Sequence, residues 1–164
     1  MDASRIRRLT YGGLLTALIA ALTAYVKITI PGAGGYYHPG DGAIALACVM
    51  LGPYAAIPAA LGSALADALS GYMQYAPYTF VVKGLMGLIA GYGLARGNIG
   101  LRAVLSLIVA SCALVGGYFA VDFMFGGVGY ALAGIPWNAL QAAIFIFSGI
   151  VFLVTGIVRL INKR

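Results

Sequence analysis

Residues 60–93 read ALGSALADALSGYMQYAPYTFVVKGLMGLIAGYG, which is two apolar helical segments joined by a short aromatic turn. The first segment contains one acid, Asp67, and the second contains one base, Lys83. An ionisable group at membrane depth is costly and normally faces a cavity or a partner. The residues between the two charges include Tyr72, Gln74, Tyr75 and Tyr78. The stretch therefore predicts the mouth of a polar, ring-lined pocket in a membrane protein.

The composition of the whole chain agrees with a membrane protein. Hydrophobic residues make up 62% of the sequence and charged residues only 9%, whereas about a quarter of a soluble domain is charged. A removed signal peptide does not explain this, because apolar segments recur up to the C-terminus. The net charge of +6 comes from bases at the ends of apolar segments. Membrane topology produces that pattern, so no nucleic-acid partner is expected.

The apolar segments predict an all-α membrane protein with a single integral membrane domain over residues 1–164. Gly- and Pro-rich stretches at 30–40 and 126–136 are too irregular to span a bilayer, so we expect them to be loops. The expected transmembrane helices form a bundle of six, at about 10–28, 41–52, 55–72, 77–95, 103–125 and 137–159.

The basic residues orient this bundle. Six spans place three basic clusters on one face, which the positive-inside rule assigns to the cytoplasm together with both termini. The clusters are Arg5, Arg7 and Arg8, then Arg96 and Arg102, then Arg159, Lys163 and Arg164. The loops at 29–40, 72–77 and 126–137 then lie outside, and the first of them is a candidate lid over a binding site.

Polar and aromatic side chains converge on the predicted outer half. Tyr and Trp at a bilayer interface often form only an aromatic belt. A belt does not need Asp122, Asn138 or Gln141, and the last two are three residues apart and can face the same space. Amides both donate and accept hydrogen bonds. We therefore expect a pocket for a small ligand with an aromatic ring and polar substituents.

Several of these features have a structural alternative. Asp67 and Lys83 lie on neighbouring antiparallel segments, so they could form an internal ion pair rather than contact a ligand. Asp41 opens the second segment, where the helix dipole favours an acid. Small residues recur in the first segment in two registers, Ala17 with Ala21 and Ala20 with Ala24. Such a face serves either internal packing or a partner chain.

The motifs favour capture of a ligand over chemistry. An intramembrane enzyme needs a nucleophile with a base, or a metal cluster. The sequence has one histidine, His38, and no HExxH, GxSxG or paired-cysteine motif, so we expect no metal and no cofactor. A stand-alone carrier or channel is the remaining alternative. Carriers usually contain internal repeats, and none is visible, while an aromatic outer site favours capture over conduction.

The chain resembles the substrate-binding S components of energy-coupling factor (ECF) transporters, most closely the hydroxymethylpyrimidine and vitamin B6 branch. The resemblance covers nearly the whole chain. It is carried by His38-Pro39-Gly40-Asp41, Leu51-Gly52-Pro53, the phrase GSALADALSGY at 62–72, KGLMG at 83–87, and Ile135-Pro136-Trp137-Asn138 with Gln141.

This resemblance implies six membrane helices in a prokaryotic cell membrane and high-affinity binding of a vitamin or precursor near the outer face. It also implies a transmembrane T component and two ATPase subunits as partners. The first helix would dock on the T component through Ala17 and Ala21 or Ala20 and Ala24, and the first outer loop would gate the site. The candidate ligand-binding residues are Tyr37, His38, Tyr75, Tyr78, Lys83, Asp122, Trp137, Asn138 and Gln141.

Overall fold

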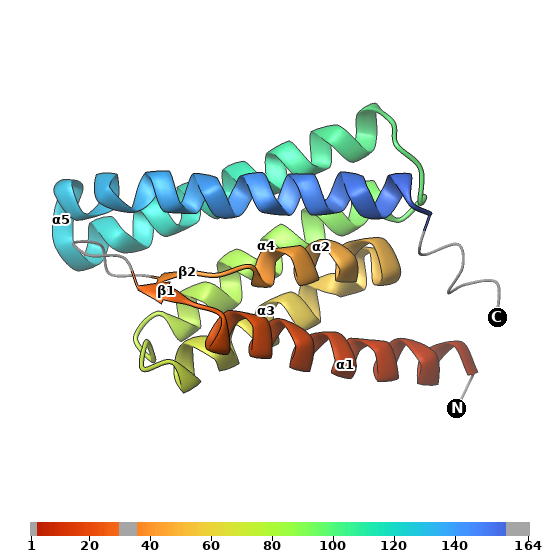
Figure 1. Cartoon of the computed structure of the whole chain (residues 1–164), viewed down its shortest axis with the longest axis horizontal. Helices are drawn as coiled ribbons and strands as arrows, with labels where there is room; N and C mark the ends of the chain where they lie inside the picture. The colour runs from red at the N-terminus through yellow and green to blue at the C-terminus, as the bar shows by residue number, and fades with distance from the viewer. Residues whose placement is uncertain (1–2, 30–35, 157–164) are drawn as a thin grey trace.

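The computed structural model describes residues 3–29 and 36–156. These residues form a helical bundle with one very short hairpin (Figure 1). The helices are α1 (Ala3–Tyr25), α2 (Gly40–Leu51), the 3-10 turn η1 (Gly52–Ala55), α3 (Ala56–Leu69), α4 (Ala76–Leu94) and α5 (Leu101–Val154). Strands β1 (Ile28–Thr29) and β2 (Tyr36–Tyr37) pair antiparallel.

The last helix, α5, contains two helical arms joined at one residue. Gly127 has φ 73 and ψ −172, a conformation that is essentially restricted to glycine. The chain reverses there, and the two arms run side by side in opposite directions (Figure 1). The loop expected at 126–136 is therefore wrong: apart from Gly127 these residues are helical, and Pro136 lies inside the second arm rather than at its start.

The bounds predicted for the second to fifth helices agree with the structure to within about three residues. The sixth was predicted over 137–159, but the second arm of α5 follows Gly127 directly, and residue 159 lies outside the described part of the chain. The first helix differs as well. That helix was expected over 10–28, but it spans Ala3–Tyr25, and β1 follows at residues 28–29. Arginine is a good helix former, so the basic leader continues the helix instead of preceding it. The third helix ends at Leu69, just before Gly71, whose φ of +85 favours glycine and stops the helix.

Small residues bring neighbouring helices into close contact. A Cβ atom added at Gly87 would lie 3.0 Å from both the carbonyl oxygen of Ala55 and the Cβ of Ala59, and one at Gly91 would meet the backbone of Gly52. On the other side of α3, a Cβ at Gly62 would lie 2.8 Å from the carbonyl oxygen of Thr16. Close backbone approach of this kind is typical of helices packed in membranes.

The two ends of the bundle differ in chemistry. The start of α1, the α4–α5 turn and the end of α5 lie at one end, which we call the basic end because it holds Arg5, Arg7, Arg8, Arg96 and Arg102 (Figure 1). The β1–β2 hairpin, the α3–α4 turn and Gly127 lie at the opposite end, which we call the aromatic end. Within the described residues, two helical stretches, Gly40–Leu69 and Leu101–Thr155, are long and apolar enough to cross a membrane.

Candidate functional site

Tyr75, which directly precedes α4, and the face of α4 that points into the bundle carry polar groups at intervals of one helical turn. Tyr75, Thr79 and Lys83 are 6%, 2% and 0% exposed. The first arm of α5 runs antiparallel to α4 and supplies the hydrogen-bonding partners of Tyr75 and Thr79. The Tyr75 hydroxyl donates to Asp122 Oδ1 at 2.9 Å, and the hydroxyls of Thr79 and Tyr118 are hydrogen-bonded at 3.1 Å. These bonds fix the first arm of α5 against α4.

The innermost of these residues forms what we call the Lys83 cluster, made of Lys83, Asp41, Gln141 and Tyr118. Lys83 Nζ lies 2.6 Å from Asp41 Oδ1, and both side chains are fully buried. The same nitrogen donates to Gln141 Oε1 at 3.1 Å and lies 5.6 Å from the centre of the Tyr118 ring. The cluster joins α2, α4 and both arms of α5, and a buried ion pair needs such added hydrogen bonds to offset desolvation.

The expected ion pair between Asp67 and Lys83 is therefore wrong, because Lys83 pairs with Asp41. The helices α3 and α4 are indeed neighbours. However, Asp67 lies near the last residue of α3 and Lys83 lies well inside α4, which offsets them by roughly 7 Å along the helix axis. Asp41 does lie in the first turn of α2, as expected, and it also holds the buried lysine.

A second group, the Asp122 cluster, lies nearer the aromatic end and contains Asp122, Tyr75, Tyr130, Phe125 and Tyr78. The hydroxyls of Tyr75 and Tyr130 are 3.4 Å apart. The Phe125 ring stands edge-on to Tyr75 and Tyr78, with centroids 5.0 and 5.5 Å away. Burial raises the pKa of Tyr75 far above its ordinary value, so its hydroxyl remains a donor to the carboxylate. The cluster is a carboxylate framed by aromatic rings.

The second arm of α5 brings Asn138 and Gln141 towards these clusters. Gly134 makes room for Asp122, since a Cβ at Gly134 would lie 2.6 Å from Asp122 Oδ2 and 3.5 Å from Asn138 Nδ2. Gln141 is 4% exposed and belongs to the Lys83 cluster. Trp137 is 37% exposed, so its ring reaches the surface. The amides predicted from their spacing thus lie beside the two charged clusters.

His38 lies immediately before α2 and is 5% exposed. It packs near Gly40 and Thr23, since a Cβ at Gly40 would meet Thr23 Oγ1 and lie 3.0 Å from His38 Nδ1. Burial lowers the pKa of His38 to about 4, with Asp41 raising it and Lys83 lowering it further. The imidazole is therefore neutral at physiological pH. The side chain of Tyr37 and residues 30–35 of the expected lid lie outside the described part of the chain.

The small residues of α1 divide between the surface and the interior. Gly13, Ala17 and Ala21 are exposed, Ala20 is partly buried, and Ala24 is 9% exposed. Only the register of Ala17 and Ala21 therefore presents a continuous small-residue face to the outside. The register of Ala20 and Ala24 turns towards the protein, where Ala24 contributes to packing.

The sequence pattern missed three features of these clusters. The sequence pattern does not indicate Asp41 as the partner of Lys83, it gives Tyr118 no role, and it predicts a loop at Tyr130. The spacing of Tyr118 and Asp122, one helical turn apart, was a usable signal for a shared face. Among residues 3–29 and 36–156, no group of three or more His, Cys, Asp or Glu side chains could hold a metal ion.

The fold and the site define a helical protein with membrane-capable segments and a buried polar site between its helices. Comparison with known proteins gives the family. A family model described as "ECF-type riboflavin transporter, S component" matches residues 3–161. The chain belongs to this family and is therefore the membrane-embedded, substrate-binding subunit of a transporter, not an enzyme.

Two curated relatives match the chain over most of their own length. An uncharacterized protein of Pyrococcus woesei is 34% identical over 149 residues, which cover 89% of this chain and 95% of the relative. The thiamine precursor transporter HmpT of Lactococcus lactis is 32% identical over 146 residues, which cover 88% of this chain and 84% of the relative.

Proposed function

We propose that this S component captures a small water-soluble vitamin or precursor of the hydroxymethylpyrimidine or vitamin B6 type. The observation that carries the proposal is the Asp122 carboxylate framed by Tyr75, Tyr130 and Phe125, with Asn138 beside it. The relative named as a thiamine precursor transporter supports the same class of ligand. The family description names riboflavin, which makes riboflavin the second candidate.

The chemistry of the clusters suits a polar heteroaromatic ring. A carboxylate accepts hydrogen bonds from an exocyclic amino or hydroxymethyl group, and such charge-assisted bonds are stronger than neutral ones. The Asn138 amide can donate to a ring nitrogen and accept from a ring substituent. Tyrosine and phenylalanine faces can stack on the ring itself. Tyr78 and Trp137 supply further aromatic surface, and His38 and Gln141 further polar contacts.

We place the binding site in the outer half of a six-span bundle in a prokaryotic cell membrane. The arginines of the described residues gather at the basic end, which the positive-inside rule assigns to the cytoplasm together with both termini. The Asp122 cluster lies nearer the opposite end. Reading the two arms of α5 as separate spans supports the count of six. A ligand arriving from outside would then meet the aromatic end first.

The energy for uptake would come from partner subunits, namely a T component and two ATPases. The exposed stripe of Gly13, Ala17 and Ala21 on α1 supports docking of the T component in that register. Helices approach closely over small residues, which gives a flat face for a partner helix.

Ligand titrations of the purified protein test the proposed substrate. Trp137 is the only tryptophan in the chain, so changes in its fluorescence report binding near the second arm of α5. Hydroxymethylpyrimidine or pyridoxine should bind tightly without ATP. We expect Asn138→Ala to weaken binding by roughly 1–3 kcal/mol, because a polar group of the bound ligand would then be buried without its hydrogen bond.

Asn98→Ala is the matched control, since Asn98 lies in the α4–α5 turn at the basic end. It should leave the affinity unchanged. Equal affinities for wild type and Asn138→Ala would remove Asn138 from the site. Tight binding of riboflavin alone would transfer the assignment to the second candidate. Ion flux through protein in liposomes, without saturable ligand binding, would favour a stand-alone channel or carrier instead.

A further inference from the structure

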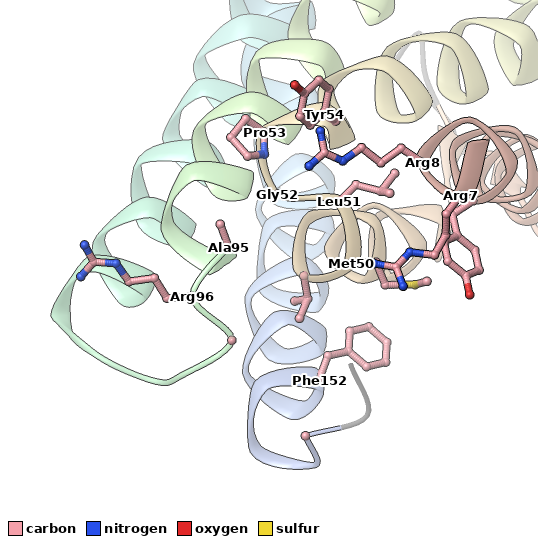
Figure 2. A pocket seen from close by; sticks show the side chains of 14 residues that line it. Arg7, Arg8, Met50, Leu51, Gly52, Pro53, Tyr54, Ala95, Arg96 and Phe152 are labelled. Carbon is pink, nitrogen blue, oxygen red and sulfur yellow. The ribbon is translucent and has the colours of Figure 1, made fainter. Parts of the chain in front are cut away.

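Two adjoining cavities lie at the basic end, away from the proposed substrate site. The first has a volume of about 480 Å³ (Figure 2). Its charged wall consists of Arg7, Arg8 and Arg96, and its apolar wall includes Met50, Leu51 and Phe152. None of its described lining residues is acidic. A cavity with several guanidinium groups and no carboxylate attracts an anion.

Two arginine side chains reach this cavity from α1, namely Arg7 and Arg8 (Figure 2). Arg96 lines the cavity from the turn after α4, but its guanidinium group points away from the other two. The guanidinium carbon of Arg8 lies 4.8 Å from the centre of the Tyr54 ring, and this cation–π contact orients the side chain. Planar guanidinium groups match the geometry of phosphate oxygens. The side of the cavity formed by Arg7 and Arg8 is therefore suited to a phosphate group.

The second cavity, of about 460 Å³, shares Arg8, Leu51 and Tyr54 with the first. It continues between α1 and α3 over Leu9, Ile57 and Leu61, and apolar surface dominates its lining. Gly12 and Gly13 form part of its wall and have open space where a Cβ would stand. The pair of cavities thus joins a cationic chamber to an apolar groove on the outside of the bundle.

We propose that these cavities form a binding site for an anionic phospholipid, with the phosphate group in the arginine-lined cavity and an acyl chain in the groove. A free phosphate would use the first cavity but would leave the groove empty, and the shared wall at Arg8, Leu51 and Tyr54 favours a molecule with both parts. With the orientation proposed above, the lipid would come from the cytoplasmic leaflet, where anionic headgroups attract basic residues.

Native mass spectrometry of the detergent-solubilised protein tests this site with phosphatidylglycerol and phosphatidylcholine as probes. Phosphatidylglycerol should bind more tightly. The double variant Arg7→Gln/Arg8→Gln should lose about thirtyfold in affinity for it, because each basic residue contributes about 1 kcal/mol near an anionic headgroup. The control Arg102→Gln removes a charge at the same end from a residue that lines neither cavity, and it should change the affinity less than about twofold.

A second variant separates the lipid from a free anion. Gly13 lines the groove, and a Cβ added there meets no atom within 4 Å. Gly13→Trp places a bulky ring at this wall, so it should weaken phosphatidylglycerol binding while leaving weak binding of glycerol phosphate intact. Equal binding of both lipids, or an equal loss in Arg102→Gln, would overturn the proposal. Displacement of the lipid by millimolar inorganic phosphate would assign the cavity to a free anion. Vitamin binding is measured separately, so failure here leaves the proposed function standing.

Discussion

Lys83 is the residue whose burial requires the most compensation. Its side chain is fully buried, and an isolated charge in such surroundings costs several kcal/mol. Asp41, Gln141 and the Tyr118 ring surround the ammonium group. Because these partners come from α2 and both arms of α5, one side chain links helices that are distant in sequence.

Removing the lysine should therefore destabilise the whole protein. We expect Lys83→Met to lower the free energy of unfolding by about 3–5 kcal/mol, because the Asp41 carboxylate remains buried without its partner. Thermal unfolding in detergent measures this. The double variant Asp41→Leu/Lys83→Met should recover part of the loss. Lys27→Met, at an exposed position, is the control, and equal melting temperatures for the two lysine variants would contradict the prediction.

His38 should make stability depend on pH. Burial lowers the pKa of His38 from 6.5 to about 4. The unfolded chain therefore binds a proton more readily, so the contribution is fully present above pH 6.5 and is lost as the pH falls towards 4. The loss is up to about 3 kcal/mol. Melting temperatures measured between pH 7 and pH 4 should fall more steeply for the wild type than for His38→Asn, and parallel profiles would refute this.

At the scale of single residues, the sequence indicated which polar residues matter but not which of them pair with each other. Asp122 and Gln141, which the sequence singled out as polar residues in apolar segments, are both buried in the structure. The partner of Lys83 was misassigned because neighbouring helices do not place every charge at the same depth. Depth depends on where each helix begins and ends, which the sequence indicates only to within a few residues.

At the scale of the helices, glycine has two different roles, and substitution should separate them. Gly91 faces the Gly52 backbone, whereas Gly116 in α5 has no atom within 4 Å of an added Cβ. We expect Gly91→Ala to destabilise the protein by about 1–3 kcal/mol through overpacking. Gly116→Ala should be neutral or stabilising by up to about 1 kcal/mol through helix propensity. Chemical unfolding of both variants checks this, and a reversed order would show that the close contact at Gly91 is unimportant.

The same residue type explains the misassigned loop. Residues 126–136 contain several glycines and one proline, a composition typical of loops in soluble proteins. In apolar surroundings such a segment favours a helix over a loop. The reason is that backbone groups without water must hydrogen-bond to one another, and a helix provides those hydrogen bonds. One glycine with a positive φ was enough to turn the chain. Sequence periodicity alone does not indicate which glycine of several takes that role.

At the scale of the whole molecule, charge and aromatic character are separated between opposite ends. The sequence predicted this separation well, because it follows from the order of basic and aromatic segments and does not depend on side-chain pairing. The relative placement of the turns follows from that order, whereas the family was indicated by particular phrases such as GSALADALSGY and KGLMG. The position of the first outer loop over the site stays a prediction, because residues 30–35 lie outside the described structure.

The exposed face of α1 should serve the complete transporter and not the isolated subunit. We expect Ala17→Trp to block vitamin uptake by cells while leaving the affinity of the purified protein unchanged, because Ala17 is exposed and distant in sequence from both clusters. Uptake of labelled vitamin and titration of the purified variant give the two readouts. Leu14→Trp, at another exposed position of α1, controls for added bulk. Loss of binding together with uptake would assign Ala17 to internal packing.

The reversal at Gly127 also constrains how the protein is made. The two helical arms of α5 lie within Leu101–Val154 and are joined at a single glycine. No polar linker separates the arms. With the six-span topology proposed above, we expect both arms to leave the translocon together as one hairpin, because a backbone in lipid must form its own hydrogen bonds. Pairwise insertion of the last third of the chain is then the expected route of its biogenesis.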